Sequence, residues 1–318
     1  MAIALVVAAA ACGGPPPLPP LPPNSFAFAV VGDAPYYPIE QGRFGRVLDD
    51  VERGDVAWLL HVGDFLWYPC SDEAYEERRR QLAALPRPVV YTPGDNEWAD
   101  CWQEKPGRYP PLGRLASLRR IFFPAPGRSL GGRPMAVESQ AADPAFAEFV
   151  ENARWERGGF VFATLHVVGS GNAGAPFPGR GAADDAEAAR RAEAAVAWLD
   201  RTFDVARARS AKGVVLALHA NVGLERADSG RARRGYERLV ARLEERVAVF
   251  PGSVLLVHGD SHVQRVDHPL ADSAGRPYAN FTRLETFGSP DVGWVRVTVD
   301  TVAGRIVRYE PRLVRGWW

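Results

Sequence analysis

The sequence lacks an excess of charge of either sign. Lysine plus arginine and aspartate plus glutamate both number 38, so the formal net charge is zero. This balance gives no reason to expect nucleic acid or anionic lipid as a partner, and any preference for a polyanion must be local. Apolar residues make up 47% of the 318 residues. That composition is typical of a globular protein with one large core, or at most two domains.

Long apolar runs are also scarce. The run from Met1 to Cys12 is rich in alanine and valine; it is too short to span a bilayer but long enough for the core of a signal peptide. Three alanines precede Cys12, as in a bacterial lipoprotein cleavage site, although a basic residue before the run and the preferred leucine are both missing. We expect residues 1–12 to direct export to the periplasm or cell envelope, with a lipidated Cys12 as a membrane tether.

Residues 13–25 are dominated by proline, which favours an extended polyproline II linker over a packed core. The remaining residues, 26–318, show no break in composition that requires a second domain. We therefore expect a signal segment, a linker and one folded domain. Nothing in the sequence indicates the oligomeric state.

Cysteine is rare as well, and only Cys70 and Cys101 follow the N-terminal segment. In an oxidising compartment this even pair predicts one disulfide, which would close a loop of about 30 residues. Two unrelated buried thiols are the alternative. Each cysteine follows a segment that carries candidate metal ligands.

Short apolar runs alternate with longer amphipathic stretches, which indicates an α/β fold. The predicted strands are residues 26–31, 56–62, 88–92, 160–168, 213–218, 254–258 and 294–299. The predicted helices are residues 44–52, 72–85, 112–123, 183–208 and 231–249.

Five of the predicted strands end in residue types that bind metals. The endings are Gly32-Asp33, Gly63-Asp64, Gly94-Asp95-Asn96-Glu97, His219 and Gly259-Asp260-Ser261-His262. The carboxyl ends of strands in open α/β sheets line the ligand crevice, so these side chains are expected to converge on one site. We attribute the glycine before each aspartate to a sharp turn of the backbone.

The ordered set resembles the calcineurin-like metallophosphoesterase superfamily, whose motifs run Asp-x-His, Gly-Asp, Gly-Asn-His or Gly-Asp-Asn-His, a single His, and Gly-His-x-His. The resemblance covers roughly residues 26–265, and the segment 93–98, Pro-Gly-Asp-Asn-Glu-Trp, resembles a subgroup of exported bacterial members. It implies an α/β fold with a four-layer αββα sandwich and two mixed β-sheets. It also implies hydrolysis of a phosphomonoester or phosphodiester by a hydroxide shared between two divalent metals.

Site roles follow from the resemblance by position. The metal ligands would be Asp33, Asp64, Asn96, His219, Asp260 and His262, with Asp64 bridging the two metals. Asp64 and Glu97 are the predicted catalytic residues, and Asn96 and Asn172 the predicted substrate-binding residues. The ligand types suit Mn, Fe or Zn, with Mg also compatible. The expected partner is a small phosphoester.

Three positions depart from the family pattern. Pro35 stands where the first motif has its histidine, and Tyr36 or Tyr37 is a candidate substitute. Glu97 stands where the third motif has a histidine that protonates the leaving group, and it could do so only if burial raised its pKa. Asp260 replaces a histidine and adds negative charge. These departures favour the alternative of a non-catalytic binding or scaffold protein on the same fold.

Other residues near these motifs have two interpretations. His258 is the ligand in place of Asp260 if the motif register shifts. A second set either lines the substrate pocket or serves packing and surface ion pairs: Trp67, Trp98, Trp102, Arg108, Arg114, Arg119 and Arg120.

Overall fold

The computed structural model describes residues 17–225 and 233–314. The predicted signal and lipoprotein segment, including Cys12, lies outside the described residues. Within the described part of the chain, no helix has the length and apolar character needed to cross a bilayer.

The first of two sheets has the strand order β12-β11-β1-β2-β3. β1, β2 and β3 run parallel, whereas β11 and β12 are antiparallel to their neighbours. Its strands are β1 (Ser25–Val31), β2 (Leu59–His61), β3 (Val89–Tyr91), β11 (Gly293–Asp300) and β12 (Arg305–Leu313).

The second sheet has the order β4-β5-β6-β7-β8-β10-β9. Its middle strands β6, β7, β8 and β10 are parallel, and β4, β5 and β9 are antiparallel. Its strands are β4 (Glu138–Ser139), β5 (Ala153–Arg157), β6 (Phe160–Thr164), β7 (Gly213–Ala217), β8 (Ser253–His258), β9 (Arg265–Asp267) and β10 (Phe281–Glu285).

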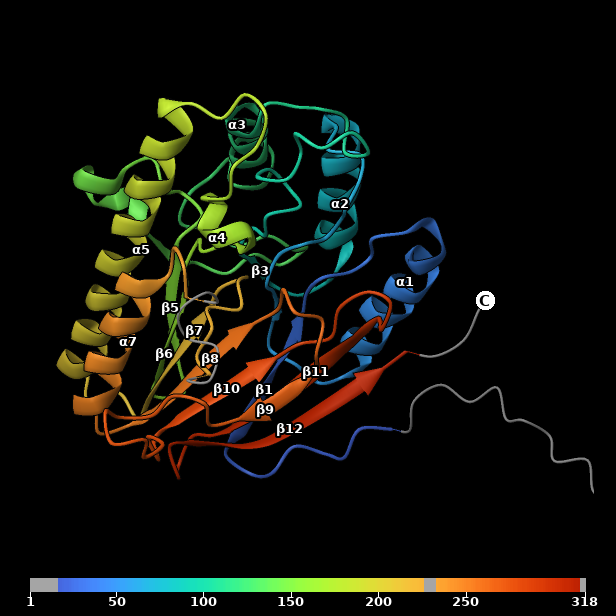
Figure 1. Cartoon of the computed structure of the whole chain (residues 1–318). Coiled ribbons are helices and arrows are strands. Elements are labelled where there is room, and N and C mark those ends of the chain that lie inside the picture. The colour runs from blue at the N-terminus through green and yellow to red at the C-terminus, as the bar shows by residue number, and fades with distance from the viewer. Residues whose placement is uncertain (1–16, 226–232, 315–318) are drawn as a thin grey trace, which may run out of the picture.

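Helices cover the outer face of each sheet (Figure 1). The first sheet is covered by α1 (Pro38–Arg53), α2 (Asp72–Ala84) and α3 (Pro111–Phe122), and the second by α5 (Ala182–Ala208) and α7 (Glu237–Val249). The short elements are α4 (Gly169–Ala173), η1 (Gln140–Ala142) and η2 (Pro144–Phe146).

Alternation of side chains along the strands explains the layering. In β1, Phe26, Phe28 and Val30 enter a core between the two sheets, together with side chains from β6, β7, β8 and β11. The alternate residues Ala27, Ala29 and Val31 face the helices instead. Because successive residues of a strand point to opposite faces, each sheet is buried on both sides. This arrangement confirms the expected αββα sandwich with two mixed sheets.

Part of the proline-rich segment packs on the domain. Leu18 and Leu21 contact the core between the first sheet and its helices. The Pro19 carbonyl accepts a hydrogen bond from the Arg296 guanidinium at 2.6 Å. The described end of the predicted linker therefore lies against the first sheet before β1 begins.

His61, the last residue of β2, supports the loop that carries Asp64. Its Nδ1 accepts a hydrogen bond from the Gly63 amide at 3.1 Å, and its ring packs edge-on against Phe44, Phe65 and Tyr91. Burial is the main cause that lowers the pKa of His61 to about 3. A neutral imidazole is thus part of the fold.

We expect His61→Asn to reduce the pH dependence of stability. An unfolded histidine titrates near pH 6.5, so the unfolded chain binds the extra proton between that pH and about 3. Stability contributed by neutral His61 is present above pH 6.5 and falls by at most about 1.4 kcal/mol per pH unit below it. Asparagine retains an acceptor for Gly63 but does not titrate. Urea unfolding at pH 7 and pH 5 measures the slope, and equal slopes in both proteins would contradict this account.

Candidate metal centre

The candidate ligands lie at the carboxyl ends of parallel strands from both sheets. Asp33 follows β1, Asp64 follows β2 and Asp95 follows β3, while His219 follows β7 and two further ligands, Asp260 and His262, follow β8. The structure therefore brings these strand endings together, as the sequence predicts. The loops after β1, β2 and β3 belong to the first sheet, and those after β7 and β8 come from the middle of the second.

Several of these residues have an unusual backbone conformation. Asp33, Asp64, Asp260 and His262 have φ values of 53°, 56°, 73° and 61°. Non-glycine residues rarely occupy this left-handed region, and those that do are often found at functional sites. Here the conformation turns each side chain back toward the cluster.

The glycines before the aspartates make room for carboxylates of neighbouring loops. A Cβ on Gly94 would clash with the carboxylate of Asp64, and one on Gly259 would clash with that of Asp33. Gly63 has a φ of 96°, in the left-handed region, whereas Gly94 and Gly259 do not have a positive φ. At Gly94 and Gly259 the observed need for glycine is the close approach of a carboxylate, and the expectation of a sharp turn stays a prediction there.

Four carboxylates and two imidazoles form the cluster. Ligand atoms of Asp33, Asp64 and His219 lie within 4.8 Å of one another, as do those of Asp95, His219 and Asp260. His219 belongs to both groups: its Nε2 is 3.1 Å from Asp95 Oδ1 and 3.5 Å from Asp64 Oδ1. His262 Nε2 lies 3.6 Å from Asp33 Oδ1.

Both imidazoles are oriented by backbone carbonyls. His219 Nδ1 is 2.9 Å from the Val62 carbonyl, and His262 Nδ1 is 2.7 Å from the Ser289 carbonyl. A carbonyl can only accept, so each Nδ1 carries the proton and each Nε2 is left with a lone pair facing the carboxylates when the ring is neutral. This is the arrangement of histidines that bind metals.

The electrostatics of the cluster call for a cation. Burial and neighbouring carboxylates raise the pKa of Asp33 and Asp64 well above the usual range, although His219 opposes the shift. Burial also raises the pKa of Asp260. Asp33 is fully buried, and its Oδ2 has no hydrogen-bond partner among the described residues. These donors fit divalent metals, which would neutralise the charges and occupy the unpaired oxygen.

Tyr36, which follows Pro35, is the tyrosine that reaches the cluster where the first motif would place its histidine. Its hydroxyl donates to Asp64 Oδ2 at 2.6 Å and lies 3.2 Å from His262 Nε2. Burial and then the neighbouring Asp64 raise the pKa of Tyr36, so the phenol stays protonated. Of the two tyrosines considered, Tyr36 reaches the cluster, whereas Tyr37 packs against Trp67.

Asp95 is a cluster residue that sequence reasoning did not select. Burial acts to raise the pKa of Asp95, but hydrogen bonds with His219 and Ser170 outweigh it and lower the pKa. Ser170 Oγ donates to Asp95 Oδ2 at 3.0 Å and lies in α4, where residues 170–172 all have left-handed φ and ψ. Asp95 follows Gly94 as Asp33 and Asp64 follow their glycines, and that repeated pattern was the signal available.

Glu97 has a different place from the one expected of a proton donor. Its Oε1 accepts from the Phe65 amide and its Oε2 from the Gly94 amide, both at 3.0 Å. The side chain is fully buried and is not among the residues that line the cavity. Burial raises the pKa of Glu97 as the prediction required. Its carboxylate nevertheless joins the β2 and β3 loops and does not face the space where a substrate would lie.

The two predicted asparagines differ in location. Asn96 lines the cavity, and its backbone amide donates to Asp64 Oδ1 at 3.1 Å. The roles of its side chain in binding metal and substrate stay predictions. Asn172 is buried, and its side-chain oxygen accepts hydrogen bonds from Arg191 and from the Val168 amide. The structure therefore does not bring Asn172 into the cavity.

The other candidates lie away from the cluster. His258 Nδ1 donates to the Gly259 carbonyl at 2.8 Å, and burial lowers the pKa of His258 to about 3. The four arginines form ion pairs: Arg108 with Glu104, Arg119 with Glu151, and both Arg114 and Arg120 with Asp72. For these arginines, the structure supports the interpretation as ion pairs and not as residues that line the substrate pocket.

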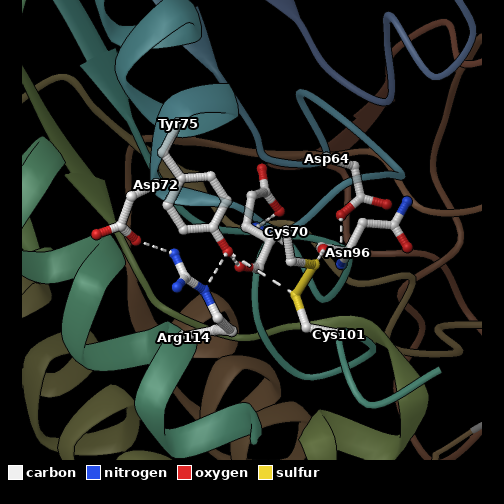
Figure 2. The surroundings of a disulfide bond; sticks show 9 residues. Asp64, Cys70, Asp72, Tyr75, Asn96, Cys101 and Arg114 are labelled. Atoms are coloured by element: carbon white, nitrogen blue, oxygen red, sulfur yellow. Dashed lines mark hydrogen bonds and ion pairs between the residues drawn. A yellow bond between two sulfur atoms is a disulfide. The ribbon is translucent and has the colours of Figure 1, made fainter. Parts of the chain in front are cut away.

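A disulfide joins Cys70 and Cys101, with Cα atoms 5.8 Å apart (Figure 2). This confirms the predicted pair. Both sulfurs lie 3.4 Å from the Asn96 carbonyl oxygen, and the Tyr75 hydroxyl donates to the Glu97 carbonyl. The Arg114 guanidinium in turn donates hydrogen bonds to the Tyr75 hydroxyl and to Asp72. The disulfide and Tyr75 thus hold the backbone of the β3 loop beneath the cluster.

An open cavity of about 580 Å³ leads to the cluster. Its lining residues are Tyr36, Tyr37, Asp64, Trp67, Asp95, Asn96, Asp260, His262, Ser289 and Pro290. No lysine or arginine is among these lining residues of the described chain. The lining instead contains three carboxylates, Asp64, Asp95 and Asp260, and three aromatic rings, Tyr36, Tyr37 and Trp67.

Comparison with known proteins supports the fold. No family model matches the chain, and no curated protein matches it. A dimetal phosphatase from Danio rerio superimposes with a TM-score of 0.50 at 12% identity, covering 91% of this chain and 99% of that one. A protein of Thermus thermophilus superimposes with a TM-score of 0.48 at 10% identity over the same shares of the two chains. At this identity, the likeness to the Danio rerio structure establishes the fold and not the activity.

Removing the disulfide with Cys70→Ala and Cys101→Ala is expected to lower stability. The cysteines are 31 residues apart, and a loop of this length contributes about 3 to 4 kcal/mol on the chain-entropy model. Urea unfolding of the double variant against the oxidised wild type measures the loss. An unchanged midpoint would contradict a structural role for this bond.

Proposed function

We propose that the chain is a metal-dependent phosphoesterase that hydrolyses a phosphomonoester or phosphodiester at a dinuclear divalent-metal centre. The observation that carries this proposal is the convergence of four aspartates and two oriented histidines at the carboxyl ends of both sheets. The fold of the Danio rerio dimetal phosphatase adds support.

The residues that would hold the metals are Asp33, Asp64, Asp95, His219, Asp260 and His262, with Asn96 at the edge of the cavity. Bound divalent cations supply Lewis acidity at phosphorus and make water a nucleophile at neutral pH. Asp64 is held through both oxygens: the Tyr36 hydroxyl donates to its Oδ2, and the backbone amide of Asn96 donates to its Oδ1.

Cations are also needed for the substrate to enter. A phosphate ester is an anion, and the described lining of the cavity offers aspartates without lysine or arginine. Like charges repel strongly in a site of low dielectric constant. Metal ions at the cluster would reverse the local charge and attract the phosphate.

The proton for the leaving group needs a source other than Glu97, whose two oxygens already accept backbone hydrogen bonds. Tyr36 is the hydroxyl group of the lining that lies beside Asp64, and its phenol is protonated. We assign to Glu97 a positioning role in this chain, because it fixes the loops that bear Asp64 and Asp95.

A location outside the cytoplasm is part of the proposal. The Cys70–Cys101 disulfide supports it, because structural disulfides persist in oxidising compartments. Lipidation of Cys12 stays a proposal that mass spectrometry of the protein from its native host can test.

Asp64→Ala is expected to reduce kcat for phosphoester hydrolysis by on the order of 100- to 1,000-fold, because a carboxylate that would hold the metals is lost. The assay uses a panel of monoesters and diesters with Mn, Zn, Mg or Fe added to chelator-treated protein. Asp49→Ala, on the exposed side of α1, is the matched control and should retain wild-type activity.

Hydrolysis that survives Asp64→Ala or exhaustive chelation would contradict the proposal. Circular dichroism of the variant distinguishes a lost site from a lost fold. Bound metal without hydrolysis of any ester in the panel would favour the alternative of a binding protein.

The aromatic side of the cavity fits the alcohol part of the ester. Tyr37 and Trp67 pack edge-on with ring centroids 5.6 Å apart, and Lys105 Nζ lies 4.6 Å from the Trp67 centroid. Tyr37 is 38% exposed. We infer that esters of planar alcohols bind better than small alkyl esters, because aromatic contact adds about 1 kcal/mol beyond buried area.

Trp67→Ala should therefore raise KM about five-fold for an aryl phosphate and change it little for a small alkyl phosphate. Trp102→Ala is the control, since Trp102 stacks on Phe177 and does not line this cavity. Steady-state kinetics with the two esters measure the difference. An equal rise in KM for both esters would argue against aromatic recognition.

A further inference from the structure

The donor atoms at the centre are mostly oxygens. Carboxylates come from Asp33, Asp64, Asp95 and Asp260, whereas nitrogen comes from two imidazoles, His219 and His262. The remaining polar groups that face the cluster, the Tyr36 hydroxyl and the Asn96 side chain, carry oxygen as well. Carboxylate and carbonyl oxygens suit Mn and Mg, and imidazole shifts preference toward Zn.

The cluster is built to receive ions and is more than a chance group of acids. Asp33 is fully buried, and its Oδ2 has no hydrogen-bond partner among the described residues although its Oδ1 accepts from the Asp260 amide at 2.9 Å. Two divalent ions would bring four positive charges to four carboxylates. That balance leaves a buried site close to neutral.

Asp260 is the most exposed of the four cluster carboxylates. Its Oδ1 lies 3.8 Å from His219 Nε2, while its Oδ2 accepts from the backbone amide of Asn221 at 2.9 Å. Its side chain is 28% exposed and lines the cavity, so its replacement disturbs buried neighbours less than replacement of the other three. The left-handed backbone at Asp260 also admits histidine, because His262 has the same conformation two residues later.

We propose that Asp260 makes this centre favour hard, oxygen-binding divalent cations, Mn²⁺ first and Mg²⁺ next, at the expense of Zn²⁺. This inference rests on the proposed function, because it assumes that the cluster binds metal. Absolute affinities for N and O sites rise from Mn²⁺ to Zn²⁺ in most proteins, so the quantity that reports selectivity is the ratio of the Mn²⁺ and Zn²⁺ dissociation constants.

The experiment is isothermal titration of the chelator-treated full chain with Mn²⁺ and with Zn²⁺, for wild type and Asp260→His. We expect the affinity ratio to move toward Zn²⁺ by at least about ten-fold in Asp260→His, since an anionic oxygen is exchanged for an imidazole nitrogen. Asp49→His, which makes the same exchange on the exposed side of α1, should leave the ratio at the wild-type value.

The second variant, Asp260→Asn, retains an oxygen donor and removes one charge. It is expected to weaken both metals while keeping their ratio, and it tests the idea even if Asp260→His does not fold. An unchanged ratio in folded Asp260→His, or a shift toward Zn²⁺ in Asp260→Asn as large as in Asp260→His, would overturn the inference.

Hydrolysis measured on the same metal-loaded samples separates this inference from the proposed function. Wild-type hydrolysis with an unchanged metal ratio in Asp260→His would leave the phosphoesterase standing and refute the role of Asp260. Absence of binding for both metals to wild type would refute both.

Discussion

The burial of four carboxyl groups in one cluster is the constraint on which the rest of the structure depends. Asp33, Asp64, Asp95 and Asp260 come from loops after four strands of two sheets, and each is drawn into the cluster by specific partners. Backbone amides bind Asp33, Asp64 and Asp260, and Ser170 binds Asp95. Hydrogen bonds from the protein thus fix the position of each carboxylate, as a preorganised site requires.

The surrounding loops are shaped by that requirement. Gly94 and Gly259 are needed because the carboxylates of Asp64 and Asp33 lie against their backbones. Glu97, buried beneath them, ties the β2 loop to the β3 loop through two amides. The disulfide holds the next residues of both loops together. Covalent, hydrogen-bonded and steric restraints therefore all act on the same two loops.

Much of the fold could be predicted from periodicity. Every predicted strand and helix has a counterpart, because each carries apolar residues that are buried in one of the cores. Two of the strands that were missed carry charged residues. In β10, Arg283 is fully buried between Asp267 and Glu225. In β12, three arginines, Glu310 and Pro311 interrupt the apolar residues. A paired arginine within a sheet resembles a surface loop when only the sequence is read.

The site was predictable as to loops and less so as to side chains. A Gly-Asp after a strand indicated where ligands would come from, but not which of Asp95, Asn96 and Glu97 would face the cavity. That choice depends on the backbone path of the β3 loop, which the disulfide and Tyr75 determine from elsewhere in the sequence. Likewise, the sequence could not choose between Tyr36 and Tyr37, because only the path of the chain into α1 brings the first of them to Asp64.

Two of the positions that differ from the motifs the sequence resembles have a common effect on the charge of the cluster. Replacing an imidazole by Asp260 adds a negative charge, and placing Pro35 at another imidazole position leaves Tyr36, a neutral donor, beside Asp64. The cluster thereby becomes richer in oxygen and more acidic, yet its walls contain no basic side chain of lysine or arginine among the described residues. On the proposed function, divalent cations at these carboxylates would supply the positive charge that a bound phosphate ester needs. Substrate binding and metal binding would then be coupled through the same four carboxylates.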